Sequence, residues 1–77
     1  MKILANAKTG EWYMTKQGPA KVGLTFHSPY DATVDLIINS ELRIYSIDGT
    51  INTNCVPRDE WDVLYFMSKE DYPEYHL

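Results

Sequence analysis

A chain of 77 residues has room for one small domain, which buries only about 60% of the surface that its unfolded chain would expose. The hydrophobic content of 44% excludes a disordered composition, and the small size disfavours a deep catalytic cleft. The net charge of −4 comes from residues 57–77, because the five basic and five acidic residues of 1–56 cancel.

The compartment is indicated by a lone cysteine, Cys55, and by a short apolar run at the amino terminus. Neither feature is typical of a secreted, disulfide-bonded protein. No apolar run approaches the length of a membrane span. We therefore expect a cytoplasmic protein, in the host cytoplasm if the chain is viral, with no membrane partner.

Residues 1–17 are expected to form an N-terminal hairpin. Thr9 and Gly10 supply a turn signal, and Lys8 would then face Glu11 across the turn.

Residues 20–56 alternate between apolar and polar side chains, a pattern typical of strands with one buried face. The alternation predicts a four-stranded antiparallel meander. Its polar face would carry His27, Asp35, Arg43, Tyr45, Asn52 and Asn54. Its buried face would carry Val22, Leu24, Phe26, Val34, Leu36, Ile38, Leu42, Ile44, Ile51 and Cys55.

Two turns set the expected register of this meander. Asp48-Gly49 predicts a two-residue type I′ turn that pairs residue 47 with residue 50. A three-residue loop at 39–41 then places Leu36 opposite Ile44, whereas a two-residue loop would place Leu36 opposite Arg43. We expect the three-residue loop, because it keeps the apolar side chains on one face.

Residues 57–77 form an acidic aromatic C-terminal segment, expected as a short helix followed by a tail. Pro57 suits a first helical position, and Asp59 and Glu60 favour the positive end of the helix dipole. The alternative over 57–68 is a closing strand, because Trp61, Val63, Tyr65 and Met67 alternate.

The predicted fold class is thus mainly β, with one short C-terminal α-helix, in a single domain over 1–77. Five to six antiparallel strands would form a small barrel or a curved sheet.

No group of residues has the pattern of an active site, a metal site or a cofactor site. His27, Ser28 and Asp31 are close in sequence, but adjacent residues do not provide the contacts of a catalytic triad. His27, Cys55 and His76 lack the spacing of zinc ligands. We therefore expect a non-enzymatic protein without a metal or a cofactor.

The C-terminal segment combines carboxylates with Trp and Tyr, the residue types that dominate protein interfaces. In its general look the chain resembles small viral or mobile-element proteins, although no motif identifies a family. We expect a protein-binding module, in its most specific form an inhibitor or modulator, that docks on a basic site of a larger protein. The expected contact residues are Asp59, Glu60, Asp62, Glu70, Asp71, Tyr72 and Tyr75.

Two alternatives use other parts of the chain. A small β-barrel nucleic-acid-binding protein would use the basic N-terminal hairpin, through Lys8, Trp12, Tyr13, Lys16 and Lys21. A structural subunit of a homo-oligomer would use the exposed edges of the sheet.

Overall fold

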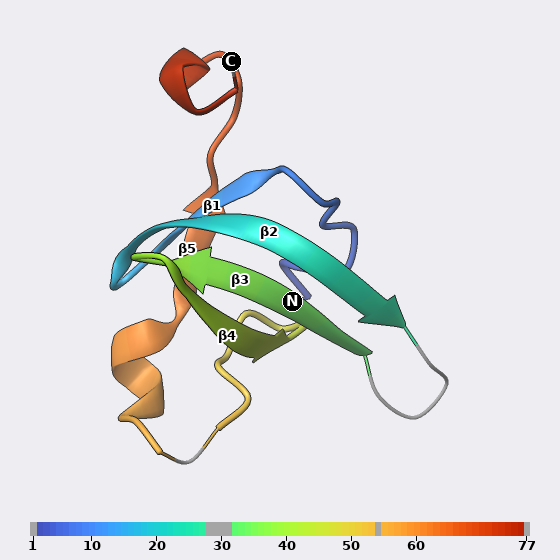
Figure 1. The fold of residues 1–77 in the computed structure, drawn as a ribbon, viewed down its shortest axis with the longest axis vertical. Coiled ribbons are helices and arrows are strands. Elements are labelled where there is room, and N and C mark those ends of the chain that lie inside the picture. Colours follow the sequence, from blue (N-terminus) through green and yellow to red (C-terminus); the bar gives the residue numbers. More distant parts are fainter. Residues whose placement is uncertain (1, 28–31, 54, 77) are drawn as a thin grey trace.

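The computed structural model describes residues 2–27, 32–53 and 55–76, and shows a mainly β protein (Figure 1). Five antiparallel strands form one sheet in the order β4-β3-β2-β1-β5. The fold class predicted from the sequence is confirmed in this respect, and the sheet is curved without closing into a barrel. The strands are β1 (Trp12–Thr15), β2 (Gly18–His27), β3 (Ala32–Ile38), β4 (Glu41–Ser46) and β5 (Val63–Phe66).

The four-stranded meander runs from β1 to β4, one strand earlier than predicted. Thr15 pairs with Gly18, so the first hairpin turns at residues 16–17. The hairpin expected over 1–17 is therefore wrong, but its predicted turn is present: the Glu11 N–H donates to the Lys8 carbonyl at 3.0 Å, with Thr9 and Gly10 between them. Residues 2–11 instead form short turns, in which the Lys8 N–H donates to Glu11 Oε1 at 2.7 Å. The last predicted strand of the meander is reduced to one bridge, between Tyr45 and Ile51.

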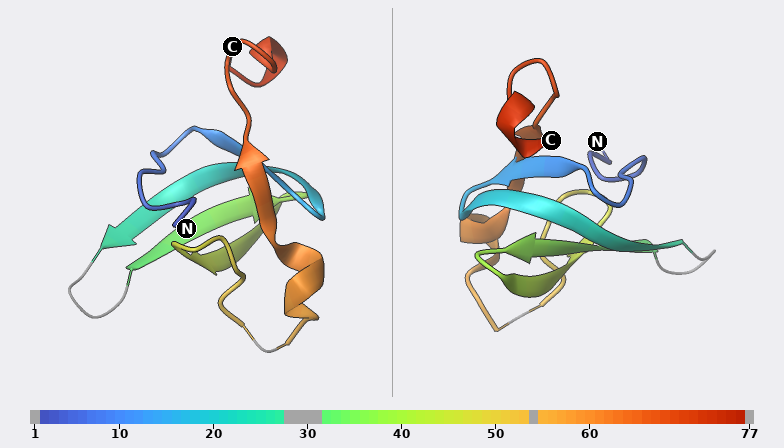
Figure 2. Two further views of the ribbon diagram at one scale, coloured as in Figure 1. Left: turned by 180° about the vertical axis from the view of Figure 1, so that it is seen from behind. Right: turned by 45° about the horizontal axis from the view of Figure 1, so that its top comes forward.

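One face of the sheet, the inner face, is covered by three segments. Seen from behind in Figure 2, the N-terminal turns, the connection after β4 and strand β5 cross this face. The Leu4 N–H donates to the Ile47 carbonyl at 2.8 Å, and the Val63 N–H donates to the Gly49 carbonyl at 2.9 Å. The core beneath them consists of Leu4, Ala7, Tyr13, Ala20, Val22, Val34, Leu36, Ile38, Tyr45 and Ile51.

The loop between β3 and β4 has two residues, and the predicted three-residue loop is wrong. Asn39 and Ser40 both have positive φ, of 53° and 67°, as a type I′ turn requires. Leu36 consequently pairs with Arg43, and Val34 pairs with Tyr45. The shift of one residue turns every side chain of β4 to the opposite face.

The turn after β4 has three residues, where the sequence predicted a two-residue turn at Asp48-Gly49. The Ser46 N–H donates to the Thr50 carbonyl at 2.9 Å, so residues 47–49 form the loop. Asp48 Oδ1 accepts from the Thr50 N–H at 3.0 Å and from the Thr50 hydroxyl at 2.7 Å. A type I′ turn would require positive φ at both Asp48 and Gly49, but only Gly49 has it, at 91°. The carboxylate thus selects a turn in which Asp48 keeps ordinary backbone angles.

A bulge in β2 moves two further side chains. Val22 pairs with Leu36 and Thr25 with Val34, so two residues of β2, Gly23 and Leu24, lie opposite one residue of β3. The predicted pairing of Leu24 with Leu36 and of Phe26 with Val34 is therefore wrong.

Together, these shifts exchange residues between the two faces. Tyr45, predicted to be on the polar face, is the largest fully buried side chain. Leu24, Phe26, Leu42 and Ile44, predicted to be in the core, are exposed, and so is Cys55. Val22, Val34, Leu36, Ile38 and Ile51 are buried as predicted.

The segment after Pro57 contains both a short helical turn and a strand, the two alternatives considered from the sequence. Arg58–Trp61 form a 3-10 helix, η1, and Pro73–Tyr75 form a second one, η2. No α-helix is present among the described residues, so the predicted C-terminal helix is wrong. Asp62 has extended backbone angles, and the chain then enters β5, which pairs with β1.

Candidate functional site

The acidic residues proposed from the sequence fall into two groups. Asp59 and Glu60 lie on η1, with Asp62 directly after it, whereas Glu70 and Asp71 precede η2. Strand β5 separates the two 3-10 helices, and η1 and η2 lie at opposite ends of the molecule (Figures 1 and 2). The structure therefore does not bring all five carboxylates into one surface.

Around η2, four aromatic side chains form what we call the C-terminal aromatic cluster: Trp12, Tyr65, Tyr72 and Tyr75. The Trp12 and Tyr75 ring centroids are 4.8 Å apart, and those of Tyr72 and Tyr75 are 6.2 Å apart. Tyr65 and Tyr72 stack with centroids at 6.4 Å, and their hydroxyls are 2.8 Å apart. The cluster joins β1, β5 and η2, so Tyr72 and Tyr75 lie together as the predicted site requires.

Local hydrogen bonds fold the C-terminal residues back towards the end of β5. The Ser68 hydroxyl donates to Asp71 Oδ2 at 3.1 Å, and the Tyr72 N–H donates to the Ser68 carbonyl at 2.9 Å. His76 Nε2 lies 2.9 Å from the carbonyl of Met67, which is fully buried. These contacts hold η2 in place from both of its ends.

Carboxylates flank Tyr72 and precede Tyr75 in the chain. Glu70, Asp71 and Glu74 are all exposed. The hydrogen bond with Tyr65 raises the pKa of Tyr72 above its ordinary value, and the charges of Asp71 and Glu74 add to the rise. Glu74 was not among the contact residues proposed from the sequence, although its position between Tyr72 and Tyr75 in the chain would have suggested it.

The acids near η1 have other neighbours. Asp62 Oδ2 lies 3.9 Å from Lys16 Nζ, and the Gln17 side chain donates to the Glu60 carbonyl at 2.7 Å. Asp59 and Glu60 are exposed. These contacts tie η1 to the β1–β2 turn and leave the aromatic cluster at the other end of β5.

The residues proposed for nucleic-acid binding do not form one surface either. Lys8, Lys16 and Lys21 are exposed, but Lys16 faces Asp62. Tyr13 is only 6% exposed and packs edge-on against Phe66, with ring centroids 5.3 Å apart. Burial raises the pKa of Tyr13, and the Glu11 charge adds to the rise. The Tyr13 ring is thus part of the core and has no free face for a stacked base.

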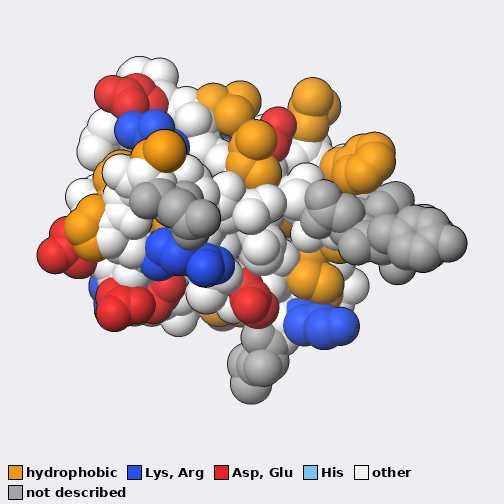
Figure 3. All heavy atoms as spheres, turned by 90° about the horizontal axis from the view of Figure 1, so that it is seen from below, with side chains coloured by type: hydrophobic (Ala, Val, Ile, Leu, Met, Phe, Trp, Pro, Cys, Tyr) orange, Lys and Arg blue, Asp and Glu red, His pale blue; other side chains and the backbone are white. Residues whose placement is uncertain are grey.

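The sheet face opposite the core carries a feature that the sequence reasoning missed. We call it the outer face, defined by Leu24, Phe26, Ile37, Leu42 and Ile44, which are 37% to 74% exposed. In Figure 3 apolar side chains stand out along the upper margin of the view, with polar atoms between them. The available signals were the Asn39-Ser40 pair, which suits a two-residue turn, and Gly23, because a glycine inside a strand pattern suggests a bulge.

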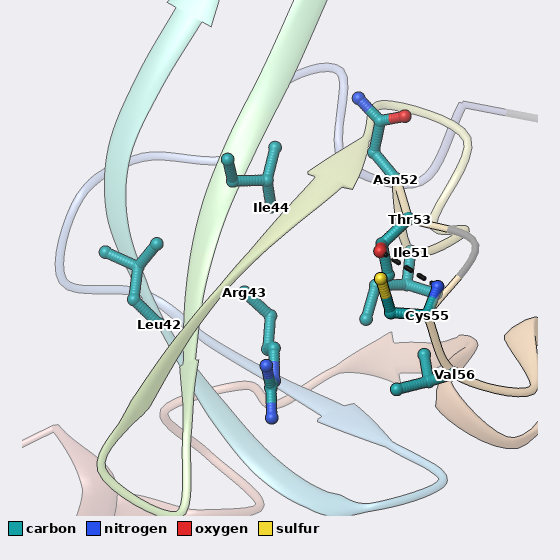
Figure 4. A pocket seen from close by; sticks show the side chains of 8 residues that line it. All are labelled: Leu42, Arg43, Ile44, Ile51, Asn52, Thr53, Cys55 and Val56. Atoms are coloured by element: carbon teal, nitrogen blue, oxygen red, sulfur yellow. Dashed lines mark hydrogen bonds between the residues drawn. The ribbon is translucent and has the colours of Figure 1, made fainter.

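A shallow groove of about 270 Å³ lies between β4 and the facing residues 51–53, 55 and 56 (Figure 4). Leu42, Ile44, Ile51 and Val56 give it an apolar lining. The Cys55 N–H donates to Thr53 Oγ1 at 3.2 Å on the same wall. Arg43 also borders the groove, and its guanidinium carbon lies 5.1 Å from the centroid of the Trp61 ring.

The described residues contain no group of three His, Cys, Asp or Glu side chains that could hold a metal ion. Ser28 and Asp31 lie outside the described residues. No helix in the described part of the chain is long and apolar enough to cross a membrane.

No protein-family model, no curated protein and no solved structure matches this chain.

Proposed function

We propose that this chain is a non-enzymatic protein-binding module that docks on a basic site of a larger protein. The observation that carries the proposal is the C-terminal aromatic cluster with Glu70, Asp71 and Glu74 beside it. Tyr and Trp side chains provide large contact areas at little cost in conformational entropy, and they are enriched among the residues that dominate interfaces.

The charge near the cluster supports a basic partner. Three carboxylates lie within five residues of the chain, and together with the adjacent Lys69 they sum to −2, half of the net charge of −4. A negative surface of this kind accelerates association with a positive one and disfavours acidic partners. In its most specific form, the module is an inhibitor or modulator that covers a basic functional site of its target.

The contact set is narrower than the one proposed from the sequence. It consists of Glu70, Asp71, Tyr72 and Tyr75, with the addition of Glu74, Tyr65 and Trp12. Asp59, Glu60 and Asp62 lie at the other end of β5, so the proposal assigns them no direct contact.

Affinity capture from a nuclease-treated lysate of the source organism tests this function. The immobilised wild-type chain is compared with two double reversals, E70K/E74K in the cluster and D59K/E60K on η1. All four carboxylates are exposed, so both variants are expected to fold, as circular dichroism will check. We expect one protein in stoichiometric amount, with its affinity lowered at least tenfold by E70K/E74K and unchanged by D59K/E60K.

Two outcomes would contradict the proposal. One is a captured protein that binds E70K/E74K as tightly as the wild type. The other is recovery of nucleic acid, with all bound protein lost on nuclease treatment, which would favour the lysine-based alternative.

A further inference from the structure

The outer face carries two opposite charges among its apolar side chains. Lys21 pairs with Ile37 across β2 and β3, and Asp35 lies two residues before Ile37 on the same side of β3. A Cβ atom at Gly23 would lie 3.6 Å from Asp35 Cβ and 3.9 Å from Ile37 Cδ1. Lys21 and Gly23 on β2 and Ile37 and Asp35 on β3 are therefore four neighbouring positions of the outer face, arranged as the corners of a rectangle that we call the cell. Lys21 and Asp35 occupy one diagonal, and Ile37 and Gly23 occupy the other.

We propose that the outer face is the interface between two copies of this chain, related by a two-fold axis along the Ile37–Gly23 diagonal. A rotation of 180° about this diagonal exchanges the ends of the other one. Lys21 then faces Asp35 of the second copy, and Asp35 faces Lys21 of the second copy. An isologous interface requires this reciprocity, in which one patch is complementary to itself.

The centre of the cell suits the same axis. Ile37 lies on the axis and packs against its own counterpart, while Gly23 has no side chain to hold the two sheets apart. Leu24 lies next to Gly23, close to the axis. Phe26, Leu42 and Ile44 lie on the Asp35 side of the axis, so each faces the Lys21 side of the second copy. The strands of the two sheets cross at a steep angle, as in the orthogonal class of sheet packing.

The distribution of charge favours a second copy as the occupant of this face. Each chain carries a net charge of −4, so two copies repel each other in most orientations. The cell around Ile37 is neutral, with one Lys and one Asp, and contact there adds two ion pairs of opposite charge. Because five apolar residues form a small interface, we expect a weak dimer, with a dissociation constant on the order of 100 µM.

Sedimentation velocity from about 5 µM to about 1 mM protein tests the dimer. The variants are K21E, D35K and the double reversal K21E/D35K. We expect each single reversal to weaken the dimer at least tenfold and the double reversal to restore it. An equimolar mixture of K21E and D35K forms a heterodimer, because each chain then meets opposite charges. The matched controls K8E and E60K, which lie off the outer face, leave the dimer unchanged.

Amide chemical shifts on dilution locate the interface without any substitution. Concentration-dependent shifts are expected at Leu24, Ile37, Leu42 and Ile44, and L24D abolishes them while the chain stays folded. A chain that is monomeric at about 1 mM overturns the proposal. A dimer unaffected by either single reversal, or with shifts confined to β5, also overturns it.

This inference does not rest on the proposed function. E70K/E74K tests partner binding, and K21E tests dimerisation, so the failure of one leaves the result of the other interpretable.

Discussion

The hydroxyl of Tyr45 donates a hydrogen bond of 2.6 Å to the backbone carbonyl of Trp61. Tyr45 lies on β4 and Trp61 ends η1, so this bond ties the sheet to the segment that leads into β5. Burial raises the pKa of Tyr45 to about 12; the Asp62 carboxylate adds to the rise, and Arg43 opposes it.

This raised pKa predicts that alkaline pH destabilises the fold. In the unfolded chain Tyr45 ionises near its ordinary pKa of 10.0, whereas in the folded chain it stays neutral until about 12. The unfolded state therefore binds fewer protons in this interval, and the contribution of Tyr45 is complete below pH 10 and lost as the pH rises to 12. We expect the free energy of unfolding to fall by roughly 2–3 kcal/mol over these two pH units from this group.

Urea unfolding of the wild type and of Tyr45→Phe at several pH values measures this effect. The variant is less stable at neutral pH, by about 1–3 kcal/mol, because the Trp61 carbonyl loses its partner. Its loss of stability above pH 10 is smaller than that of the wild type. An identical alkaline loss in both proteins would show that Tyr45 is not the responsible group.

Gly49 is predicted to tolerate no side chain. A Cβ atom there would lie 2.7 Å from Ile3 Cγ2 and 3.3 Å from Val63 Cβ. Gly10 is a matched control, since its φ of 94° is close to the 91° of Gly49 and a Cβ at Gly10 would have no neighbour within 4 Å. We expect Gly49→Ala to cost about 1–3 kcal/mol more than Gly10→Ala in thermal or urea unfolding, because steric overlap adds to the shared cost of positive φ. Equal costs would argue against the close packing of the 47–49 turn on β5.

The register of the sheet predicts opposite results for two leucines that the sequence placed on the same face. Leu36 is fully buried, so Leu36→Ala should lower the free energy of unfolding by about 2–5 kcal/mol. Leu24 is 74% exposed, so Leu24→Ala should change it by no more than about 0.5 kcal/mol. Both are measured at low protein concentration, where the proposed dimer dissociates. A large loss for Leu24→Ala would contradict the bulge at Gly23 and Leu24.

Asp48 is predicted to stabilise the turn after β4 in a pH-dependent way. The Thr50 hydroxyl, and after it the Thr50 N–H, lower the pKa of Asp48 by hydrogen bonding to its carboxylate. The stabilisation is therefore present above the ordinary pKa of the carboxyl and is lost as the pH falls through its lowered value. At pH 7 we expect Asp48→Ala to cost about 1 kcal/mol, and the two proteins should converge in acid. A difference that stays constant with pH would assign the cost to backbone effects alone.

The candidate site was predictable in composition but not in geometry. The sequence identified an acidic aromatic C-terminal segment, and Tyr72 and Tyr75 do lie together beside Glu70 and Asp71. It gave no indication that Trp12 would join them, because this contact depends on the pairing of β1 with β5. The sequence also did not indicate that Asp59 and Glu60 would lie away from the cluster, because this depends on β5 forming between η1 and η2.

Composition determined that the chain folds, and the alternation of apolar and polar residues determined the presence of β2, β3 and β4 and with them the mainly β class. The tertiary structure alone decided which face of each strand is buried. In β4 the apolar alternation indicates the wrong face, because Leu42 and Ile44 are exposed while Tyr45, on the same face as Arg43, is buried. A shift of one residue exchanges the two faces while β3 and β4 stay paired, so the pattern alone does not fix the register. Tyr45 is buried because its ring fills the core and its hydroxyl reaches the Trp61 carbonyl, a contact between residues distant in the chain.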